Sequence, residues 1–331
     1  IYLLITRSKY LKSEKKLESF VSRESGFLFN NVLFVSICFA VFWGTMFPVF
    51  SEAFTGSQIT VGPPFFNQII IPISLILLFL SGIGPLLAWR KTSKESLVRN
   101  FSIPIILALS IVLISILVGL VGLYPIITTF LCSFVFFTIV IEFWRGIKVR
   151  RNKYKENILI ALLTMINKNR SRYGGYIVHL GIVVMFIGFI GKAFDIEKES
   201  SIRIGESILL SNYKITLLNL RENERPNHYA WIADLEVKKD GKIISTLVPE
   251  KRVYFHKNEN PDRRQPHSEL SIFSTWREDV YSIFGGIDTE KGLLSIKIMI
   301  NRLVKLVWLG GYFVLFGTVI ALWPKKSLKK I

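Results

Sequence analysis

The chain has 331 residues, half of them hydrophobic, and a formal net charge of +18. Mean hydropathy is +0.42 and only 20% of the residues are charged, which excludes an intrinsically disordered chain. The hydrophobic residues form unbroken runs, so an ordinary soluble domain is excluded as well. Both cysteines, Cys38 and Cys132, lie inside such runs. The sequence therefore has neither a disulfide framework nor a C-x-x-C-H haem-attachment motif.

Six apolar runs are long enough to cross a membrane, which takes roughly 20 helical residues. Their approximate bounds are Phe27 to Phe50, Gln68 to Trp89, Phe101 to Leu123, Tyr124 to Phe143, Tyr176 to Phe194 and Leu303 to Trp323. We therefore predict an α-helical polytopic membrane protein. Five spans fall in a membrane domain over residues 27–194, and the sixth covers residues 303–323.

The distribution of positive charge predicts the orientation of these spans. Residues 1–26, 90–100, 144–174 and 325–331 together hold 23 of the 42 lysines and arginines, whereas the loop Ser51 to Asn67 holds none. By the positive-inside rule, the basic segment 1–26 and the basic tail 324–331 are predicted to be cytoplasmic. This pattern explains the basic excess as a topology signal, so no nucleic-acid partner is expected.

Two further segments lie outside the spans. Residues 156–170 carry apolar residues at helical spacing between basic flanks, which predicts a helix lying in the membrane interface and contacting lipid. Residues 195–302 hold 17 basic and 17 acidic residues and consist of short β-branched or aromatic runs, with a hairpin signal at Asp240-Gly241. They predict an inserted, extracytoplasmic, β-rich domain, either a small barrel or a sandwich.

His179 is the only histidine inside a predicted span. An ionisable side chain at membrane depth is costly, and neutral imidazole is a common iron ligand, so His179 is a candidate metal ligand. A hydrogen bond between helices is an equally good explanation from the sequence alone. His228, His256 and His267 lack ligand spacing with other histidines, cysteines or carboxylates, so structural roles are expected for them.

Several strings, in order along nearly the entire chain, resemble the C-terminal half of the CcmF family of cytochrome c maturation haem lyase subunits, which includes the related nitrite-reductase assembly (NrfE-like) proteins. They are GTMFPVFSEAFTGSQITVGPPFFN (Gly44 to Asn67), GIGPLLAWR (Gly82 to Arg90), NRSRYGGYIVHLGI (Asn169 to Ile182), PEKRVY (Pro249 to Tyr254), STWREDVYSIFGG (Ser274 to Gly286) and VWLGGYFVLFGTVIALWP (Val307 to Pro324).

The resemblance implies a role in cytochrome c-type biogenesis. Family members accept haem from a CcmE-like chaperone, assist its attachment to apocytochrome c beside CcmH-like subunits, and hold a haem b between two transmembrane histidines. The string RYGGYIVHLG places one of these haem iron ligands at His179. The second ligand and the tryptophan-rich haem-receiving segment do not occur in this sequence. We expect them upstream of Ile1, in a longer protein or a separate subunit.

The resemblance also implies a location in the bacterial inner membrane or the mitochondrial inner membrane. No catalytic residue is assigned, and whether this chain alone counts as an enzyme stays open. Trp276 and Arg277 are candidates for docking apocytochrome by their position only, and a structural role is an alternative for both. Two other functions remain under consideration: a haem-translocating subunit, and a purely structural scaffold of a membrane assembly complex.

Overall fold

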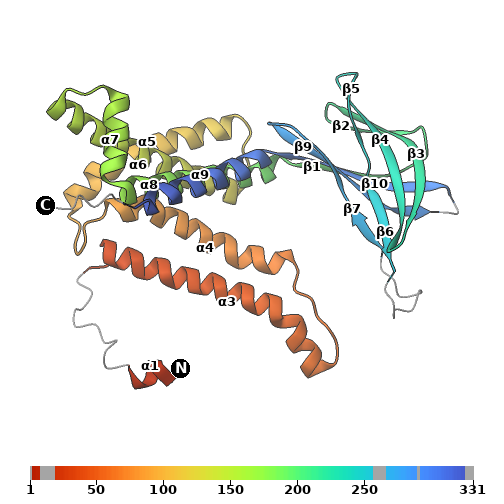
Figure 1. Ribbon diagram of the computed structural model, residues 1–331, viewed down its shortest axis with the longest axis horizontal. Helices are drawn as coiled ribbons and strands as arrows, with labels where there is room; N and C mark the ends of the chain where they lie inside the picture. Colours follow the sequence, from red (N-terminus) through yellow and green to blue (C-terminus); the bar gives the residue numbers. More distant parts are fainter. Residues whose placement is uncertain (1, 8–18, 256–265, 289–290, 325–331) are drawn as a thin grey trace. The chain divides into compact units, whose positions relative to one another are not determined.

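The computed structural model describes residues 2–7, 19–255, 266–288 and 291–324 (Figure 1). Part of the N-terminal basic segment, most of the loop Lys257 to His267, most of the C-terminal tail and His256 lie outside these residues. The chain folds as two compact units. The first comprises Ile1–Val183 and Gly310–Ile331, and the second comprises Val184–Leu309.

Six helices of the described chain are long and apolar enough to span a membrane. They are α3 (Arg23–Thr55), α4 (Pro63–Ile83, extended by the 3-10 turn η1, Gly84–Leu86), α5 (Lys94–Leu117), α6 (Leu123–Tyr154), α8 (Arg170–Ile190, extended by η2, Gly191–Phe194) and α9 (Val304–Leu322). The shorter helices are α1 (Tyr2–Thr6) and α7 (Ile158–Lys168). The prediction of a polytopic membrane protein is thereby confirmed.

Local sequence signals set the ends of these helices. Ser22 and Ser93 cap α3 and α5, and each side chain accepts a hydrogen bond from the main-chain N–H three residues on. Pro63 begins α4, where its missing N–H costs nothing. Gly56 follows α3 with φ 67°, the left-handed conformation that glycine adopts without strain.

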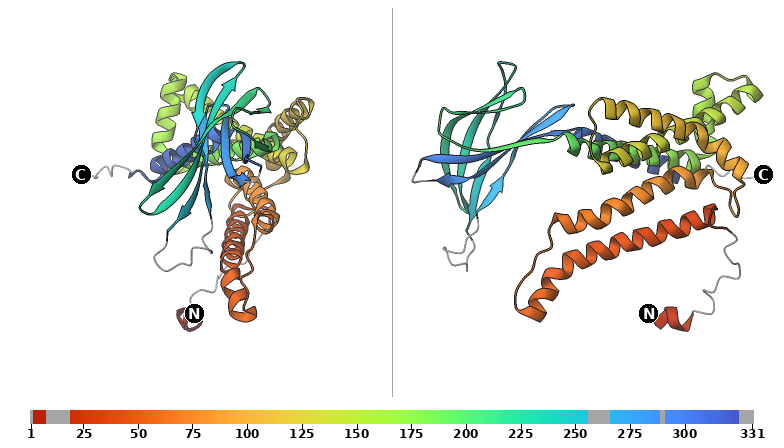
Figure 2. Two further views of the ribbon diagram at one scale, coloured as in Figure 1. Left: turned by 90° about the vertical axis from the view of Figure 1, so that its right-hand side faces the viewer. Right: turned by 180° about the vertical axis from the view of Figure 1, so that it is seen from behind.

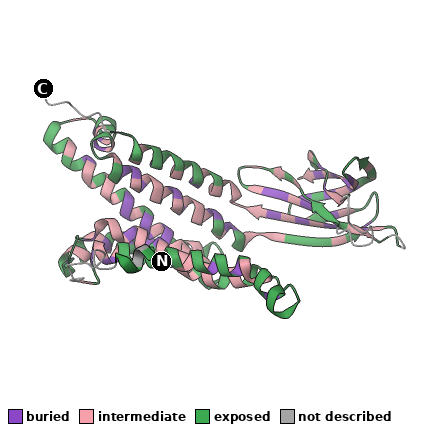
Figure 3. Ribbon diagram, turned by 60° about the horizontal axis from the view of Figure 1, so that its bottom comes forward, coloured by how far each residue is buried: buried purple, intermediate pink, exposed green. Residues whose placement is uncertain are grey.

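In the first unit α3 packs against α4, and α6 packs against α4, α5 and α7 (Figure 1). Helices α8 and α9 approach each other closely at glycines. A Cβ placed on Gly174 of α8 would lie only 2.6 Å from the main-chain nitrogen of Ala321 on α9. Much of the remaining helical surface is exposed and apolar (Figure 3), as expected for helices that face lipid.

The second unit contains a β-sandwich of two antiparallel sheets (Figure 2). One sheet has the strand order β1-β10-β9-β8. The other has the order β2-β3-β4-β6-β7, with β5 also paired to β4. The strands are β1 (Ile196–Ile202), β2 (Ser207–Leu210), β3 (Tyr213–Arg225), β4 (His228–Lys239), β5 (Lys242–Leu247), β6 (Glu250–Tyr254), β7 (His267–Glu269), β8 (Ser271–Ser274), β9 (Glu278–Asp288) and β10 (Leu293–Arg302).

The core of the sandwich lies between the two sheets. Alternate side chains along β3, β4, β9 and β10 are buried, among them Leu217, Leu235, Phe284 and Ile298, because successive residues of a strand point to opposite faces. The turn at Asp240-Gly241, with φ of 49° and 80°, joins β4 to β5 as the hairpin signal predicts. Of the two predicted arrangements, barrel and sandwich, the structure has the sandwich.

Candidate functional site

A cavity of about 790 Å³ opens among the helices of the first unit, and His179 is part of its wall. We call it the His179 cavity. Three helical elements enclose it: the first two turns of α3, the end of α4 with η1, and the first three turns of α8. The lining side chains are mostly polar or small: Arg23, Gly26, Phe27, Asn30, Leu80, Ser81, Gly84, Pro85, Asn169, Ser171, Arg172, Gly175, Tyr176 and His179.

The spacing of the lining residues follows from helix geometry. On α3, Arg23 and Asn30 are seven residues apart, and on α8, Arg172 and His179 have the same separation. Seven residues make two helical turns, about 10 Å, and bring both side chains to one face. Each helix therefore turns one polar stripe toward the cavity, with an arginine in its first turn and a neutral polar side chain two turns further along.

His179 has an unsatisfied ring nitrogen inside this cavity. Its Nδ1 is buried and has no hydrogen-bond partner among the residues that the structure describes, and the ring lies against the main chain of Ser81. Leaving such a group unpaired costs about 1–3 kcal/mol. The ring also has a hydrogen bond to the main chain of Ser81 on α4, so a contact between helices is present, and it leaves Nδ1 without a partner. An imidazole in this state can bind a metal ion or accept a donor from a bound molecule.

Glycines leave room around the imidazole. A Cβ built on Gly26, Gly84 or Gly175 would meet no atom within 4 Å, so these three positions face open space. One comes from each of the three elements that enclose the cavity. The two neighbouring glycines at the start of α8 therefore have different surroundings: Gly174 packs against α9, whereas Gly175 borders the cavity.

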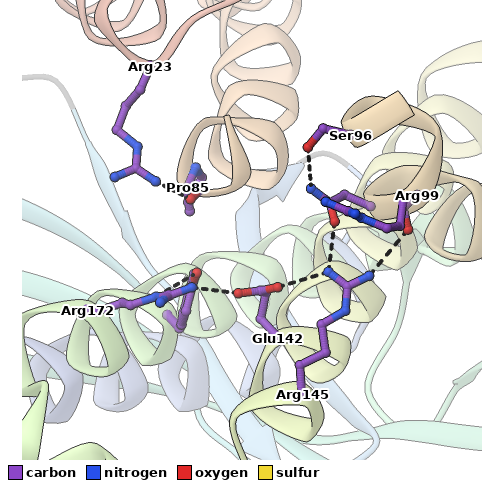
Figure 4. A network of polar contacts seen from close by, with 9 residues as sticks. Arg23, Pro85, Ser96, Arg99, Glu142, Arg145 and Arg172 are labelled. Atoms are coloured by element: carbon purple, nitrogen blue, oxygen red, sulfur yellow. Dashed lines mark hydrogen bonds and ion pairs between the residues drawn. The ribbon is translucent and has the colours of Figure 1, made fainter. Parts of the chain in front are cut away.

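Arg23 and Arg172, the two arginines that line the cavity, differ in whether a carboxylate pairs with them (Figure 4). Glu142 on α6 accepts from Arg172 at 2.6 Å and from Arg145 at 3.2 Å, and its side chain is only 10% exposed. Glu142 thus pairs with Arg145 on its own helix and with Arg172 on α8. Arg23 instead donates to the carbonyl oxygen of Pro85. Its Nε is buried and has no partner among the described residues.

No group of three metal-ligating side chains occurs in the part of the chain that the structure describes. His228 lies buried in β4, and its Nδ1 is 2.8 Å from the Asn227 oxygen. The His267 ring packs edge-on against Tyr254 at the edge of the same sheet. Both histidines therefore have structural contacts.

The two docking candidates lie in the turn between β8 and β9. The Trp276 side chain is 80% exposed, and no contact of its ring with another ring or cation occurs in the described chain. The Arg277 carbonyl accepts the main-chain N–H of Leu303 at 3.2 Å. Thr275 holds the turn by accepting the Glu278 N–H and donating to its carbonyl. The turn is thus ordered while its tryptophan is open to contact.

Sequence reasoning counted Arg23 and Arg172 only as topology charges and did not consider Asn30. A signal was present, because the seven-residue spacing of a basic and a neutral polar residue occurs at the start of both α3 and α8. What the sequence lacked was any indication that these two faces, 150 residues apart in the chain, border one cavity.

Comparison with known proteins is consistent with this architecture. Residues 193–302 match the family model described as the CcmF C-terminal beta-sandwich. The cytochrome c-type biogenesis protein ccl1 of Rhodobacter capsulatus is 28% identical over 314 residues, which are 94% of this chain and 45% of that protein. CcmF of Escherichia coli K12 is 25% identical over 318 residues, again 94% of this chain and 45% of the relative.

A solved structure described as cytochrome c heme lyase CcmF has the same fold, with a TM-score of 0.69 at 22% identity. The likeness covers 92% of this chain and 46% of the other. The chain thus spans about half the length of the relatives that it matches. Six apolar helices and an inserted β-sandwich define a multi-pass membrane protein of the cytochrome c-type biogenesis class. Within that class the chain is similar to the C-terminal half of CcmF proteins over nearly its whole length, and its residues 193–302 match the C-terminal sandwich of that family.

Proposed function

We propose that this chain is a component of a haem lyase in cytochrome c-type biogenesis, and that His179 is one axial ligand of a membrane haem b. The second ligand is a histidine outside this chain. The observation that carries the proposal is the buried, unpartnered Nδ1 of His179 beside a cavity of about 790 Å³. Similarity to cytochrome c-type biogenesis proteins supports the choice of haem over another metal group.

The residues of the His179 cavity fit such a group in three respects. The imidazole offers nitrogen, which iron binds well. Gly26, Gly84 and Gly175 leave space at the wall, as close approach of a flat macrocycle requires. Arginines at one end supply positive charge where an anionic edge would lie. When bound, haem supplies an iron that exchanges one electron. The chain's own part is to hold that group, orient it and keep its surroundings apolar on the lipid side.

The orientation of the chain in the membrane is part of the proposal. Basic residues of the loops that follow α4 and α6 stay on the cytoplasmic side, and the β-sandwich of residues 195–302 faces outward. The host membrane is the bacterial inner membrane or the mitochondrial inner membrane. In this orientation His179 lies in the cytoplasmic half of its span, two turns from Arg172.

Partners are proposed from the same similarity. The β-sandwich docks apocytochrome c, with Trp276 and Arg277 in the contact, and a CcmE-like chaperone and CcmH-like subunits complete the assembly. An exposed tryptophan on an ordered turn is suited to binding because it offers a large contact area with little loss of entropy. Attachment of haem to cysteine thiols then depends on holding both reactants close together.

Absorbance spectroscopy tests the ligand assignment. The assembly that contains this chain is purified with its natural partners, and the spectrum of reduced haem b is recorded for wild type, His179→Ala and His267→Ala. We expect His179→Ala to lose the b-type bands and His267→Ala, whose ring lies in the sandwich, to retain them. Retention of unchanged bands in His179→Ala would contradict the proposal.

A further inference from the structure

Arg23, at the edge of the His179 cavity, has no anionic partner among the residues that the structure describes. It donates to the carbonyl oxygen of Pro85, and its Nε is buried with no hydrogen bond within the described chain. Arginine carries five N–H donors and remains charged under all ordinary conditions. No carboxylate of the described residues lies within ion-pair distance of it. A partly buried charge in this state is unfavourable unless an anion completes it.

Arg172, the other arginine of the cavity, already has an anionic partner. Its guanidinium donates to Glu142 at 2.6 Å and to the Tyr176 hydroxyl at 3.4 Å. Figure 4 shows Glu142 between Arg145 and Arg172, while Arg23 stands apart at the start of α3. Of the two cavity arginines, Arg23 is therefore the one without a carboxylate partner among the described residues. It lines the same cavity as Tyr176 and His179.

The cavity thus offers two unsatisfied groups to one occupant: a nitrogen for a metal at His179 and a cation at Arg23. We propose that Arg23 binds a propionate carboxylate of the porphyrin whose iron His179 ligates. This inference rests on the proposed function, and it adds an orientation. The propionate edge faces the start of α3 and α8, and the rest of the macrocycle extends toward Asn30 and His179. Arg23 is a binding and positioning residue in this arrangement.

A phospholipid phosphate is the other anion available in a membrane. The lining of the cavity disfavours it, because acyl chains would meet Asn30, Ser81, Asn169 and Tyr176. A carboxylate attached to a ligand that also needs a nitrogen donor uses both unsatisfied groups, whereas a phosphate would satisfy one. Arginine and a carboxylate form paired, charge-assisted hydrogen bonds, which are among the stronger polar contacts in proteins.

The test compares two forms of the cofactor. The complete assembly is prepared free of haem and titrated by absorbance with protohaem or with its dimethyl ester, in which the propionates carry no charge. For wild type we expect binding of protohaem to be about tenfold tighter, the effect of one charge-assisted hydrogen bond. Arg23→Gln brings the ratio close to one, and Arg23→Lys retains part of the preference. Arg99→Gln, a change at an exposed arginine near the start of α5, leaves the ratio unchanged.

A second readout is the midpoint potential of the bound haem. Removing a positive charge beside a propionate favours the ferric state, so Arg23→Gln lowers the potential and Arg99→Gln does not. If Arg23 only held the main chain at Pro85, its replacement would change neither the preference for protohaem over the ester nor the midpoint potential.

Each outcome decides for or against Arg23. The assignment is overturned if wild type binds protohaem and the dimethyl ester equally tightly. It is also overturned if Arg23→Gln keeps the wild-type preference for protohaem. If Arg23→Gln binds neither form, Arg23→Lys decides, because restored binding with a preference supports the assignment and restored binding without one overturns it. Loss of bound phosphatidylglycerol in native mass spectrometry of Arg23→Gln, with the haem ratio intact, shows that the anion is a lipid phosphate and overturns it too. The proposed function fails separately, if His179→Ala keeps its haem.

Discussion

Gly181 in α8 lies directly against the main chain of Gly310 in α9, so closely that a Cβ at Gly181 would be 2.7 Å from the Gly310 carbonyl oxygen. Helices in lipid gain little from hydrophobic burial against one another, so close van der Waals contact stabilises their association. Gly174 and Gly317 contact the partner helix in the same way. Packing against α9 thereby holds α8, which forms one wall of the His179 cavity, in place.

We expect Gly181→Ala to lower the free energy of unfolding by about 1–3 kcal/mol, because the backbone of α9 cannot move away without disturbing its packing. Gly311→Ala is the matched control, since a Cβ at Gly311 meets no atom within 4 Å. Thermal unfolding in detergent measures both. Equal unfolding temperatures for the two variants would show that this contact is not tight in the protein.

The β-sandwich should lose stability in acid through Glu278. Its Oε1 accepts from the Tyr213 hydroxyl at 2.8 Å and from Lys239 Nζ at 2.6 Å, which joins one sheet to the other. Burial favours the protonated form, but the hydrogen bonds from Lys239 and Tyr213 outweigh it and lower the pKa of Glu278 below its usual 4.5. A lowered folded-state pKa means that the ionised group stabilises the domain above pH 4.5. This contribution disappears as the pH falls through the folded-state value.

Glu278→Gln should therefore unfold more easily than wild type at neutral pH and lose less stability below pH 4.5. Unfolding temperatures between pH 3 and pH 7 measure this difference. Asp288→Asn, at the other end of β9 and 44% exposed, serves as the control and should follow the wild-type curve. Parallel curves for Glu278→Gln and wild type would contradict the role assigned to the carboxylate.

Trp276→Ala should weaken docking of apocytochrome c without changing stability. Because the ring is 80% exposed, its removal should change the free energy of unfolding by less than about 0.5 kcal/mol. Cross-linking of an apocytochrome peptide to the assembly measures docking. Leu209→Ala, which removes another exposed apolar side chain from the sandwich, should not reduce the yield. Unreduced cross-linking in Trp276→Ala would remove this turn from the docking surface.

Labelling of single cysteines tests the orientation. In a chain without Cys38 and Cys132, Gln58→Cys and Lys242→Cys should react with a membrane-impermeant thiol reagent added to intact cells or mitoplasts. Lys91→Cys, in the basic loop after α4, should react only after the membrane is permeabilised, because the proposed orientation places that loop on the cytoplasmic side. The reverse pattern would invert the proposed topology and place the sandwich in the cytoplasm.

Most of the helical framework could be predicted because lipid requires long apolar runs, and each of the six runs contributes to one helix. The ends of the helices differ from the ends of the predicted apolar runs, because a helix continues beyond its apolar residues until it reaches a capping residue. Helix α6 extends from the expected Phe143 to Tyr154 through basic residues, and α5 begins at Lys94 after the Ser93 cap instead of at Phe101. Hydropathy carries no information on such polar turns.

Strand β6 was not predicted, although it pairs directly with β4. Its sequence, Glu250 to Tyr254, begins with three charged residues and shows no alternation of polar and apolar side chains. These charges are accommodated because Arg252 pairs with Glu250 at 2.7 Å and with Glu269 on β7 at 3.3 Å. The pair with Glu269 joins neighbouring strands, so the local sequence cannot reveal it. The His179 cavity has the same property, because its three walls meet only in the folded chain.

The β-sandwich begins and ends at one place. Strands β1 and β10 pair with Ile196 opposite Ile300, and the Arg302 N–H donates to the Asp195 carboxylate at 2.9 Å. The two junctions with α8 and α9 thus form a single stalk, closed by its own hydrogen bonds. A domain whose two ends lie together can be replaced in evolution, or grafted in the laboratory onto another helical hairpin. The helices that it joins need not change their course through the lipid. The sequence of the sandwich can thereby change while the helices on either side of it keep theirs.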